Sequence, residues 1–399
     1  MSQSAILLPD VPIADGDAPL VLHARVMAGT GGGPEKTILR SPKYIDPSRY
    51  RMAIVYIHPE GDPGIDKIRA QAIEQGASLF TISERSALSA ASYRACRQLV
   101  DELGVAIWHG HDYKSDLFGY LIGRKRPNLH CMATVHSWTD ESFRLRLYRK
   151  IDEWCLARYD LCAAVSDSVE THCLRVGVPS DRLVRLMNGI ELDDWSRSQP
   201  PQEARRELDL APDRVTIGVV GRLSGAKALH RFLHLVRGLL DADVPPFQVL
   251  LLGDGPEREK LQAMAKSFNL GEAVEFVGWQ AELQKWYEAF DLVVMTSIRE
   301  GLPNTLLEAM AMGVPSASTP VGGVRDLYDD GRCGVILEGE DPVAWVGQIA
   351  ELLRDDGRRS ELARLGRERI ETEFSFASRM EKVTALYDQL VGQVVSEER

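Results

Sequence analysis

Two carboxylates lie within the segment TSIREGLPNTLLEAMAMG, which directly follows the apolar run DLVVMTS. Glu300 falls in its glycine- and proline-containing first part, and Glu308 falls in the helical pattern that comes next. Pro303 and Asn304 favour a helix start between them. A helix start offers unpaired backbone N–H groups beside the carboxylates, which suits a ligand with phosphates and hydroxyls. The alternative is two solvated glutamates, because charged side chains are mostly exposed.

Two cations and a glycine cluster follow other apolar runs. Arg222 and Lys227 lie in GRLSGAKAL, at the end of RVTIGVVG. A departing phosphate develops negative charge, which a guanidinium fork or an ammonium group stabilises. The cluster GTGGG allows positive φ and a close approach of the backbone to a phosphate. The alternatives are a strand-end arginine, a surface lysine and an ordinary glycine turn.

The elements that must position these residues alternate between short apolar runs and helical stretches. The runs include VLHARVMA, RMAIVYIH and VAIWHGH in the first half, and RVTIGVVG, FQVLLLGDG and DLVVMTS in the second. Such runs, separated by helical intervals, predict buried parallel strands in βαβ units. The polar stretch WSRSQPPQEARRELDLAPD interrupts the pattern. We therefore expect two doubly wound α/β domains, with ligands at the carboxyl ends of the strands.

Composition limits the class of protein. The chain has 399 residues, 44% of them hydrophobic, and a formal net charge of -11, which disfavours a general nucleic-acid binder. No apolar run reaches the roughly 20 residues that span a bilayer, and the N-terminus lacks the basic region of a secretory signal. The six cysteines form no C-x-x-C pair, which favours reduced core thiols. We expect a cytoplasmic protein.

The motifs together resemble the GT4 family of retaining glycosyltransferases, which have the GT-B fold. The pattern S-x-x-E-G-x-P-x-x-x-L-E-A-M-A-x-G-x-P is similar to the family's donor-site signature. Further segments that match the family in order are TGGGPEKT, HGHD, TVH, VSDSVETHC, MNGIELDDW, GRLSGAKAL and LLGDGPER. The resemblance runs from about residue 21 to residue 335. One departure is Ala228, because many members have glycine at this position.

The resemblance implies an architecture of two Rossmann-like domains facing across a cleft, with the C-terminal helix crossing back to the first domain. The expected parts are an acceptor-binding domain over 1–195, a linker over 196–213, a nucleotide-sugar-binding domain over 214–375 and a helix over 376–399. The implied reaction transfers a sugar from a nucleotide-diphosphate sugar to an acceptor hydroxyl with retention, by front-face attack. The base, UDP or GDP, stays open. No metal or other cofactor is expected beyond the nucleotide-sugar co-substrate.

The resemblance also assigns roles to single residues. The catalytic positions are His136, Arg222, Lys227 and Glu300. The donor-binding positions are Gly31, Gly32, Gly33, Gly253, Val277, Gly278, Gly301, Leu302, Pro303, Asn304 and Glu308. The acceptor-side positions are Glu35, His111 and Asp112. In this scheme the cations stabilise the leaving diphosphate, one glutamate binds sugar hydroxyls, and Glu308 binds the ribose.

Other functions stay open. The HGHD segment admits a metal site, because His109 and His111 alternate along a strand and face the same side. An NAD-dependent dehydrogenase would use the glycine cluster and Glu60, but it leaves the cations and the two-glutamate segment unexplained. A nucleotide-sugar hydrolase or epimerase on the same fold is a nearer alternative. A non-catalytic relative that binds nucleotide sugar or a partner protein is a further one.

The helical pattern over 140–158 combines apolar residues at helical spacing with a basic side. A basic amphipathic helix can bind anionic lipid headgroups, which would place the protein peripherally on the inner face of the membrane. The acceptor would then be a lipid-linked saccharide rather than a free saccharide, as in surface polysaccharide or glycolipid synthesis. The alternative, a core-packed helix with a solvated basic side, fits the residue types better.

Overall fold

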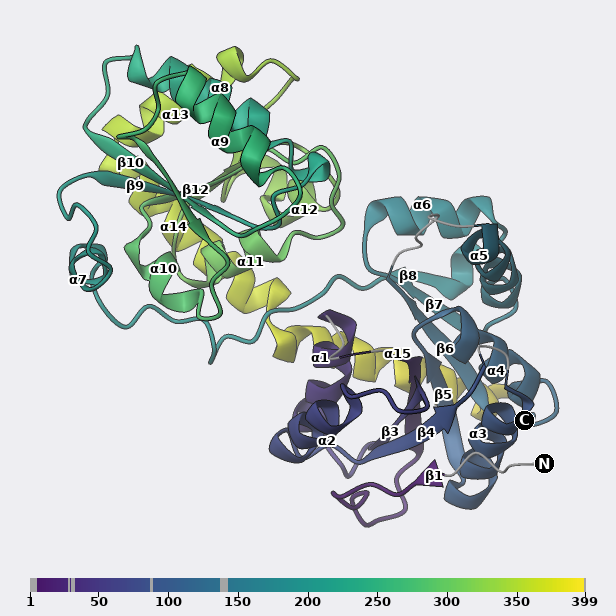
Figure 1. Ribbon diagram of the computed structural model, residues 1–399. Helices are drawn as coiled ribbons and strands as arrows, with labels where there is room; N and C mark the ends of the chain where they lie inside the picture. The colour runs from purple at the N-terminus through teal and green to yellow at the C-terminus, as the bar shows by residue number, and fades with distance from the viewer. Residues whose placement is uncertain (1–5, 28, 30–32, 87–88, 137–142, 398–399) are drawn as a thin grey trace. The chain divides into compact units, whose positions relative to one another are not determined.

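The computed structural model describes residues 6–27, 29, 33–86, 89–136 and 143–397, which form two compact units (Figure 1). The first unit comprises Met1–Met187 and Met380–Arg399, and the second comprises Asn188–Arg379. Each unit has its own sheet and its own hydrophobic core. The chain therefore returns to the first unit near its end.

The sheet of the first unit has the strand order β1-β4-β3-β2-β5-β6-β7-β8. The strands are β1 (Ile6–Leu7), β2 (Leu20–Val26), β3 (Arg51–Pro59), β4 (Leu79–Glu84), β5 (Val105–Gly110), β6 (His130–Val135), β7 (Leu161–Ala164) and β8 (Leu183–Arg185). All neighbours are parallel except β1, which pairs antiparallel with β4. Because β2 lies between β3 and β5, the order reverses at β2, and this is where ligands bind in doubly wound sheets.

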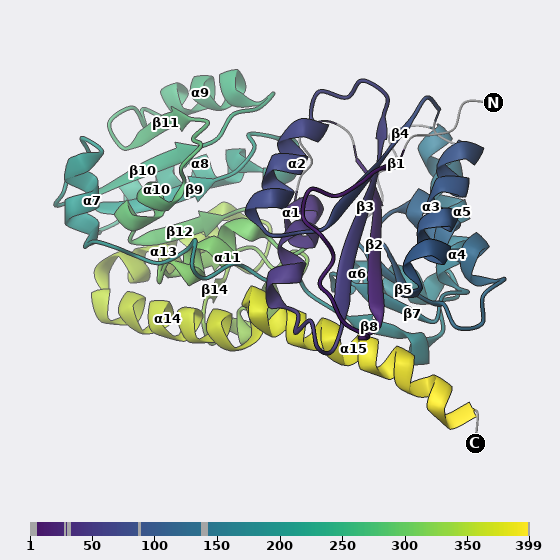
Figure 2. The same cartoon turned by 90° about the horizontal axis from the view of Figure 1, so that it is seen from below.

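Helices cover both faces of this sheet, as Figure 2 shows. They are α1 (Gly33–Arg40), α2 (Ile65–Glu74), α3 (Ala90–Leu103), α4 (Tyr113–Gly123), α5 (Phe143–Leu156), α6 (Asp167–Arg175) and most of α15 (Phe376–Glu397), with 3-10 turns at Ser41–Tyr44 and Ser180–Arg182. Side chains of α3 to α6 pack on one face, and side chains of α1 and α2 pack on the other. The alternation of β3 divides its side chains between these two cores, because Ala53, Val55 and Ile57 join the first and Ile54 and Tyr56 join the second.

The second unit has a parallel sheet in the order β11-β10-β9-β12-β13-β14. Its strands are β9 (Val215–Val220), β10 (Phe247–Leu252), β11 (Val274–Gly278), β12 (Leu292–Met295), β13 (Ser316–Ser318) and β14 (Val335–Ile336). Its helices are α7 (Pro201–Glu207), α8 (Leu229–Leu240), α9 (Arg258–Ser267), α10 (Gln284–Ala289), α11 (Asn304–Ala311), α12 (Val324–Leu327), α13 (Pro342–Arg354) and α14 (Asp356–Arg369). Short turns at Gly225–Lys227 and Asp329–Gly331 and a π-helical turn at Ile370–Phe374 complete it. The order reverses at β9, which carries the GRLSGAKAL segment at its carboxyl end.

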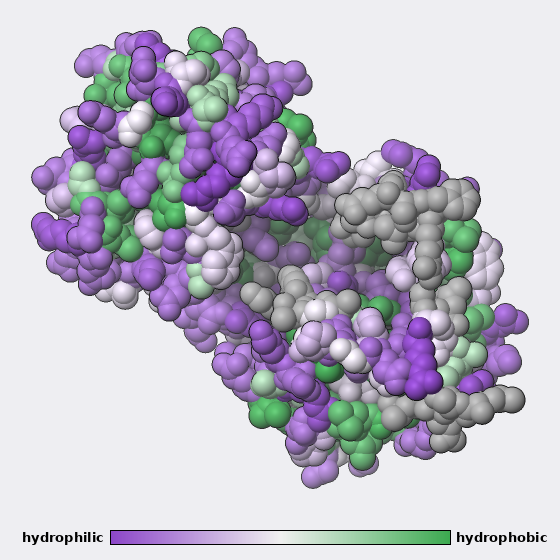
Figure 3. Space-filling view, viewed as in Figure 1, coloured by the Kyte–Doolittle hydropathy of each residue, from purple (hydrophilic) through white to green (hydrophobic). Residues whose placement is uncertain are grey.

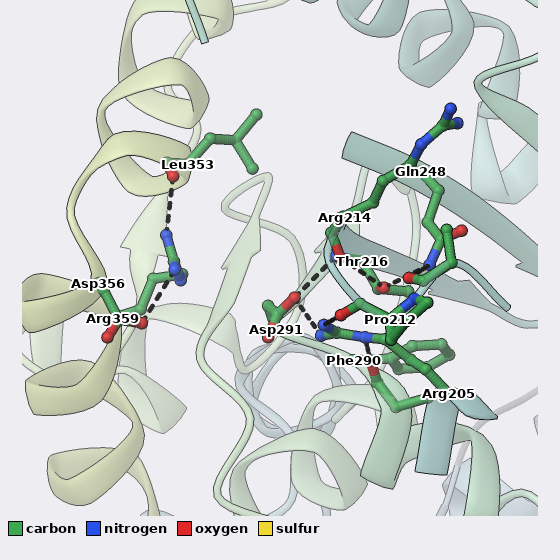
Figure 4. Close-up of polar contacts among 12 residues, drawn as sticks. Arg205, Pro212, Arg214, Thr216, Gln248, Phe290, Asp291, Leu353, Asp356 and Arg359 are labelled. Carbon is green, nitrogen blue, oxygen red and sulfur yellow. Dashed lines mark hydrogen bonds and ion pairs between the residues drawn. The ribbon is translucent and has the colours of Figure 1, made fainter. Parts of the chain in front are cut away.

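Residues 196–213, expected to be a linker, fold with the second unit (Figure 4). Arg205 of α7 is buried, and its guanidinium forms an ion pair with Asp291. The Arg205 Nε donates to the carbonyl oxygen of Ala289 at 2.9 Å, and Asp291 accepts the backbone N–H of Thr216 at 2.7 Å. The polarity and prolines that indicated a linker thus belong to a segment with a buried anchor. The assignment of acceptor and donor binding to separate domains stays a prediction.

The structure confirms the predicted fold class of two doubly wound parallel sheets. Within the described part of the chain, no helix combines the length and apolar character needed to cross a membrane. The face drawn in Figure 3 is mainly hydrophilic, with apolar residues in scattered patches. All six cysteines are buried thiols, as the sequence predicted.

Candidate active site

Lys227 and Glu300 meet beyond the carboxyl ends of β9 and β12. The Nζ of Lys227 lies 2.8 Å from Oε1 of Glu300, and only 20% and 16% of the two side chains is exposed. A Cβ at Gly221 would lie 3.3 Å from the same Nζ, so the ammonium group rests against the backbone at the end of β9. The structure therefore brings together two of the residues with predicted catalytic roles, as an ion pair within one unit.

Glycines fix the loops that carry this ion pair. Gly253 has φ of 135°, and a Cβ there would lie 1.9 Å from the carbonyl oxygen of Gly221. Gly322 has φ of 55°, and a Cβ there would lie 2.0 Å from the carbonyl oxygen of Gly301. The N–H of Gly323 donates to that same oxygen at 2.9 Å. Gly253 was predicted, whereas the VGG segment was not, although its two adjacent glycines are an ordinary turn signal.

Ala228 adopts the left-handed conformation that the family's glycine would favour. Its φ and ψ are 47° and 40°, and it is fully buried at the start of α8. The hydroxyl of Thr296 lies 3.3 Å and 3.4 Å from the carbonyl oxygens of Lys227 and Ala228, to which it donates. A left-handed L-residue costs roughly 1–2 kcal/mol. The turn is therefore kept with alanine, at a strain that glycine would not carry.

Glu308 lies on α11 and faces α10. Its carboxylate accepts a hydrogen bond from the hydroxyl of Tyr287 at 2.8 Å. Burial and this carboxylate raise the pKa of Tyr287 well above its usual value. The hydroxyl of Thr305 donates to the carbonyl oxygen of Val220 at 3.2 Å, which joins the start of α11 to the end of β9. Sequence reasoning did not find Tyr287, because no local pattern links α10 to α11.

Most of the other predicted donor-binding residues lie near strand ends of the second unit, and the glycines at 31–33 belong to the first unit. Arg222 is exposed on the turn after β9. Val277 and Gly278 end β11. Gly301, Leu302 and Pro303 directly precede α11, and Asn304 is its first residue. Trp279, which follows β11, is 72% exposed. Gly31 and Gly32 lie outside the described residues, and Gly33 begins α1 in the first unit. Their roles in donor binding stay predictions.

A series of hydrogen-bonded side chains crosses one face of the sheet in the first unit. We call it the histidine chain, and its members in order are Thr134, His109, Tyr387, His23, His111 and His136. The successive distances between ring nitrogens and hydroxyl oxygens, or between ring nitrogens, are 2.8, 2.8, 3.1, 2.9 and 3.5 Å. Three strands and helix α15 contribute to it, so it gathers residues far apart in the sequence.

Strand register explains why the imidazoles meet. His23 of β2 is the register partner of His109 of β5. His111 follows two residues later on the same side, and His136 likewise follows Thr134 of β6. Sequence reasoning anticipated His111 and His136 but missed His23. The available signal was a histidine within an otherwise apolar strand, VLHARV.

This geometry favours a hydrogen-bonded stack over a metal site. Ligand atoms of His23, His109 and His111 lie within 4.8 Å of one another. The ring planes, however, are inclined by only 16° to 36°, with centroids 4.4 to 5.1 Å apart. A metal lies in the plane of every imidazole that binds it, so stacked rings must turn before sharing an ion. Each ring nitrogen of these three histidines is already hydrogen-bonded. The expected absence of a metal stays a prediction.

Glu35 and Asp112, predicted on the acceptor side, flank the histidine chain through backbone and charge contacts. The Nε of Arg25 donates to Glu35 at 2.7 Å, and its Nη1 donates to the carbonyl oxygen of His111 at 3.0 Å. Asp112 caps α4 by accepting two backbone N–H groups of its first turn, and it accepts the N–H of Val26 at 2.6 Å. The capping contacts account for Asp112 structurally, and its acceptor role stays a prediction.

Comparison with known proteins identifies the family. The model described as Glycosyltransferase Family 4 matches residues 31–194, and that described as Glycosyl transferases group 1 matches residues 201–369. The D-inositol 3-phosphate glycosyltransferase of Corynebacterium jeikeium is 30% identical over 309 residues, which cover 71% of this chain and 72% of that protein. The chain belongs to glycosyltransferase family 4. The lipopolysaccharide core biosynthesis glycosyltransferase LpsE of Rhizobium meliloti is 32% identical, but the match spans about half of each protein, 47% and 53%.

Solved structures show the same fold. Anabaena HepE in complex with UDP aligns with a TM-score of 0.78 at 18% identity, covering 93% of this chain and 100% of that one. Sucrose-phosphate synthase from Thermosynechococcus elongatus aligns with a TM-score of 0.71 at 20% identity, covering 94% and 100%. The predicted GT-B fold is confirmed by these likenesses.

Proposed function

We propose that this chain is a retaining glycosyltransferase that moves a sugar from a nucleotide-diphosphate sugar to an acceptor hydroxyl. The observation that carries the proposal is the Lys227–Glu300 pair, held by glycine-shaped loops at the carboxyl ends of β9 and β12. A diphosphate would draw the ammonium group away from the carboxylate. The carboxylate is then available to accept hydrogen bonds from sugar hydroxyls.

The proposed mechanism is front-face attack. The bond between the anomeric carbon and the leaving phosphate oxygen breaks while the acceptor oxygen bonds the same face of that carbon. The acceptor proton passes to the leaving phosphate oxygen, so no protein base is required. Arg222 and Lys227 stabilise the developing charge, and Glu300 and His136 orient the sugar. The reaction as proposed uses no divalent metal.

The relatives indicate which donors and acceptors to try first. HepE has been solved with UDP and with UDP-glucose, which supports testing uridine nucleotides before others. Two Rhizobium meliloti relatives, LpsE and the mannosyltransferase LpsB, are named for lipopolysaccharide core biosynthesis. We therefore propose an acceptor of the surface polysaccharide or glycolipid class, with GDP-mannose as the second donor to test.

Peripheral membrane contact would go through α5. Leu147 and Trp154 are 51% and 46% exposed there, and the guanidinium of Arg158 lies 4.1 Å from the centre of the Trp154 ring. An exposed tryptophan beside arginine suits the boundary between headgroups and acyl chains. In sedimentation with vesicles rich in anionic lipid, we expect the Trp154→Ala variant to bind much less than the wild type. Equal binding by that variant would exclude α5 as the contact.

The deciding experiment is thermal stabilisation by nucleotides. Purified protein is heated with UDP, GDP, ADP, their sugars or NAD, with and without EDTA. A ligand at 100 times its Kd adds about 2.7 kcal/mol of stability, which a melting shift reports. We expect a shift with one nucleoside diphosphate that EDTA does not change. Once the donor is identified, NMR of the transfer product gives the configuration at its anomeric carbon. This configuration tests retention.

Two variants separate the donor site from general effects. Lys227→Ala should abolish the nucleotide-induced shift. The matched control is Lys285→Ala, which breaks an exposed Lys–Glu pair in the same unit and should keep the shift. A shift with NAD alone would favour the dehydrogenase alternative. Release of free sugar as the main product, whatever acceptor is supplied, would favour a hydrolase.

A further inference from the structure

The hydrogen bonds of the histidine chain couple the proton positions of neighbouring rings. Each interior imidazole uses one ring nitrogen toward each neighbour. A neutral imidazole carries one N–H donor and one acceptor nitrogen, so it donates on one side and accepts on the other. The tautomer of one ring therefore fixes the tautomer of the next.

The hydroxyl of Tyr387 joins the two parts of the chain. It lies 2.8 Å from Nδ1 of His109 and 3.1 Å from Nε2 of His23. Its single proton can go to only one of these nitrogens, so it must accept from the other. Either the donors all point from Thr134 toward His136, or they all point the opposite way. With the hydroxyl in place, only these two neutral arrangements satisfy every hydrogen bond.

We propose that Tyr387 and the interior histidines act as positioning residues that keep His136 neutral and couple its tautomer to those of the other three rings. The contact that transmits this is between Nδ1 of His111 and Nε2 of His136, at 3.5 Å with the rings inclined by 27°. The part of His136 in the reaction rests on the proposed function. The coupling itself does not, because every contact that carries it lies within the first unit.

The surroundings of the chain favour its neutral form. Arg25 donates to the carbonyl oxygen of His111, and its charge is paired with Glu35. The carboxylate of Asp112 accepts hydrogen bonds from backbone N–H groups. Tyr50, which directly precedes β3, packs against Tyr387, and their ring centroids are 5.4 Å apart. On α15 itself, Asp388 accepts from the hydroxyl of Tyr50. Burial and the neighbouring imidazoles lower the pKa of His111 well below its usual value.

The chain offers a matched pair of variants for the test. Tyr387→Phe removes the hydroxyl that links His109 to His23 and leaves the ring. Tyr50→Phe removes a hydroxyl that also joins the sheet region to α15, through Asp388 at 3.0 Å, but lies outside the histidine chain. If Tyr387 only holds the helix in place, the two variants should behave alike.

The first readout is the tautomer. The full-length protein is labelled with ¹⁵N at its nine histidines, and long-range ¹H–¹⁵N spectra report which ring nitrogen carries the proton. In the wild type and in Tyr50→Phe we expect all four histidines of the chain to show the same direction of donation, or the same ratio of the two directions. In Tyr387→Phe we expect the ratio at His109 to differ from that at the other three rings. Ratios that differ between rings in the wild type, or that stay equal at all four rings in Tyr387→Phe, would overturn the proposal whether or not the protein transfers sugar.

The second readout is kinetic and depends on the proposed function. With the donor identified by thermal stabilisation, Tyr387→Phe should lower kcat by about tenfold. The loss is moderate because His136 stays in place and only its tautomer is disturbed, which lowers kcat less than removal of a catalytic group. The donor KM should change less than about twofold, since the diphosphate site lies in the second unit. Equal kinetics for Tyr387→Phe and Tyr50→Phe would refute a positioning role. Lack of any donor binding by the wild type would refute the proposed function. The tautomer readout would still test the proposal about the histidine chain.

Discussion

The histidine chain of the first unit and the Lys227–Glu300 pair of the second are both polar clusters at strand ends, but they satisfy their atoms differently. In the chain, ring nitrogens and hydroxyls partner one another between buried strands. In the pair, opposite charges on two loops lie 2.8 Å apart. The angles at this contact are not those of a hydrogen bond, so Glu300 Oε1 accepts none from Lys227. The chain is complete without a ligand, whereas the pair has polar capacity that a ligand can use.

The difference predicts which substitutions should cost stability. A buried polar network must be satisfied by the protein, because an unpaired buried group costs about 1–3 kcal/mol. Partly exposed charges on loops carry a smaller penalty and can exchange partners when a charged ligand binds. We therefore expect substitutions in the chain to lower the free energy of unfolding, and substitutions in the ion pair to lower activity.

The largest effect is expected for Lys227→Ala. Loss of a preorganised charge at a developing anion typically costs about 100- to 1,000-fold in kcat. The free energy of unfolding should change by less than about 1 kcal/mol, because the pair is partly exposed. Steady-state kinetics and urea denaturation measure the two quantities. A stable variant with wild-type kcat would remove this lysine from the mechanism.

His23→Ala should differ from Lys227→Ala by a large loss of stability, beside the loss of kcat expected for a member of the histidine chain. It removes one hydrogen-bond partner from Tyr387 and one from His111 and opens a cavity, so we expect a loss of about 3 kcal/mol in the free energy of unfolding. Urea denaturation measures it. The control is His130→Ala, at the half-buried start of β6 in the same sheet, which should cost under about 1 kcal/mol. Equal losses in both variants would mean that the chain adds nothing beyond ordinary packing.

The two clusters should also differ in pH dependence. The pKa of His111 is lowered below its usual 6.5 by burial and by the neighbouring His109 and His23. Below about pH 6.5 the unfolded chain therefore binds more protons than the folded one, and stability falls as pH falls. The slope should approach about 1.4 kcal/mol per pH unit for this group. Urea denaturation at pH 7.5 and 5.5 should show a smaller difference for His111→Gln than for the wild type, and an unchanged one for Glu300→Gln.

The smallest effect is expected for Ala228→Gly. Relief of the left-handed strain, roughly 1–2 kcal/mol, is offset by the lost burial of one methyl, about 0.8 kcal/mol, and by greater freedom of the unfolded chain. We expect the free energy of unfolding to change by under about 0.5 kcal/mol and kcat to change by less than about twofold. A large loss of activity would show that alanine here tunes the position of Lys227.

Part of the site was predictable from local patterns. The strand ends that carry Lys227 and Glu300, the start of α11 and the glycine at 253 all follow from apolar runs and turn residues. Period-two alternation also placed His109 and His111 on one side of their strand. The partners His23 and Tyr387 did not follow, because their contacts depend on which strand and helix lie beside β5.

Local patterns in the chain account for most helices and strands of this protein, because helix and strand periods, caps and glycine turns depend on residues close along the chain. The tertiary structure decided which of these elements are neighbours. The order of the first sheet places β2 beside β5, although two strands come between them in the chain, and α15 returns from the far end to supply Tyr387. Such contacts are selected by burying both faces of a whole sheet, so no local pattern records them.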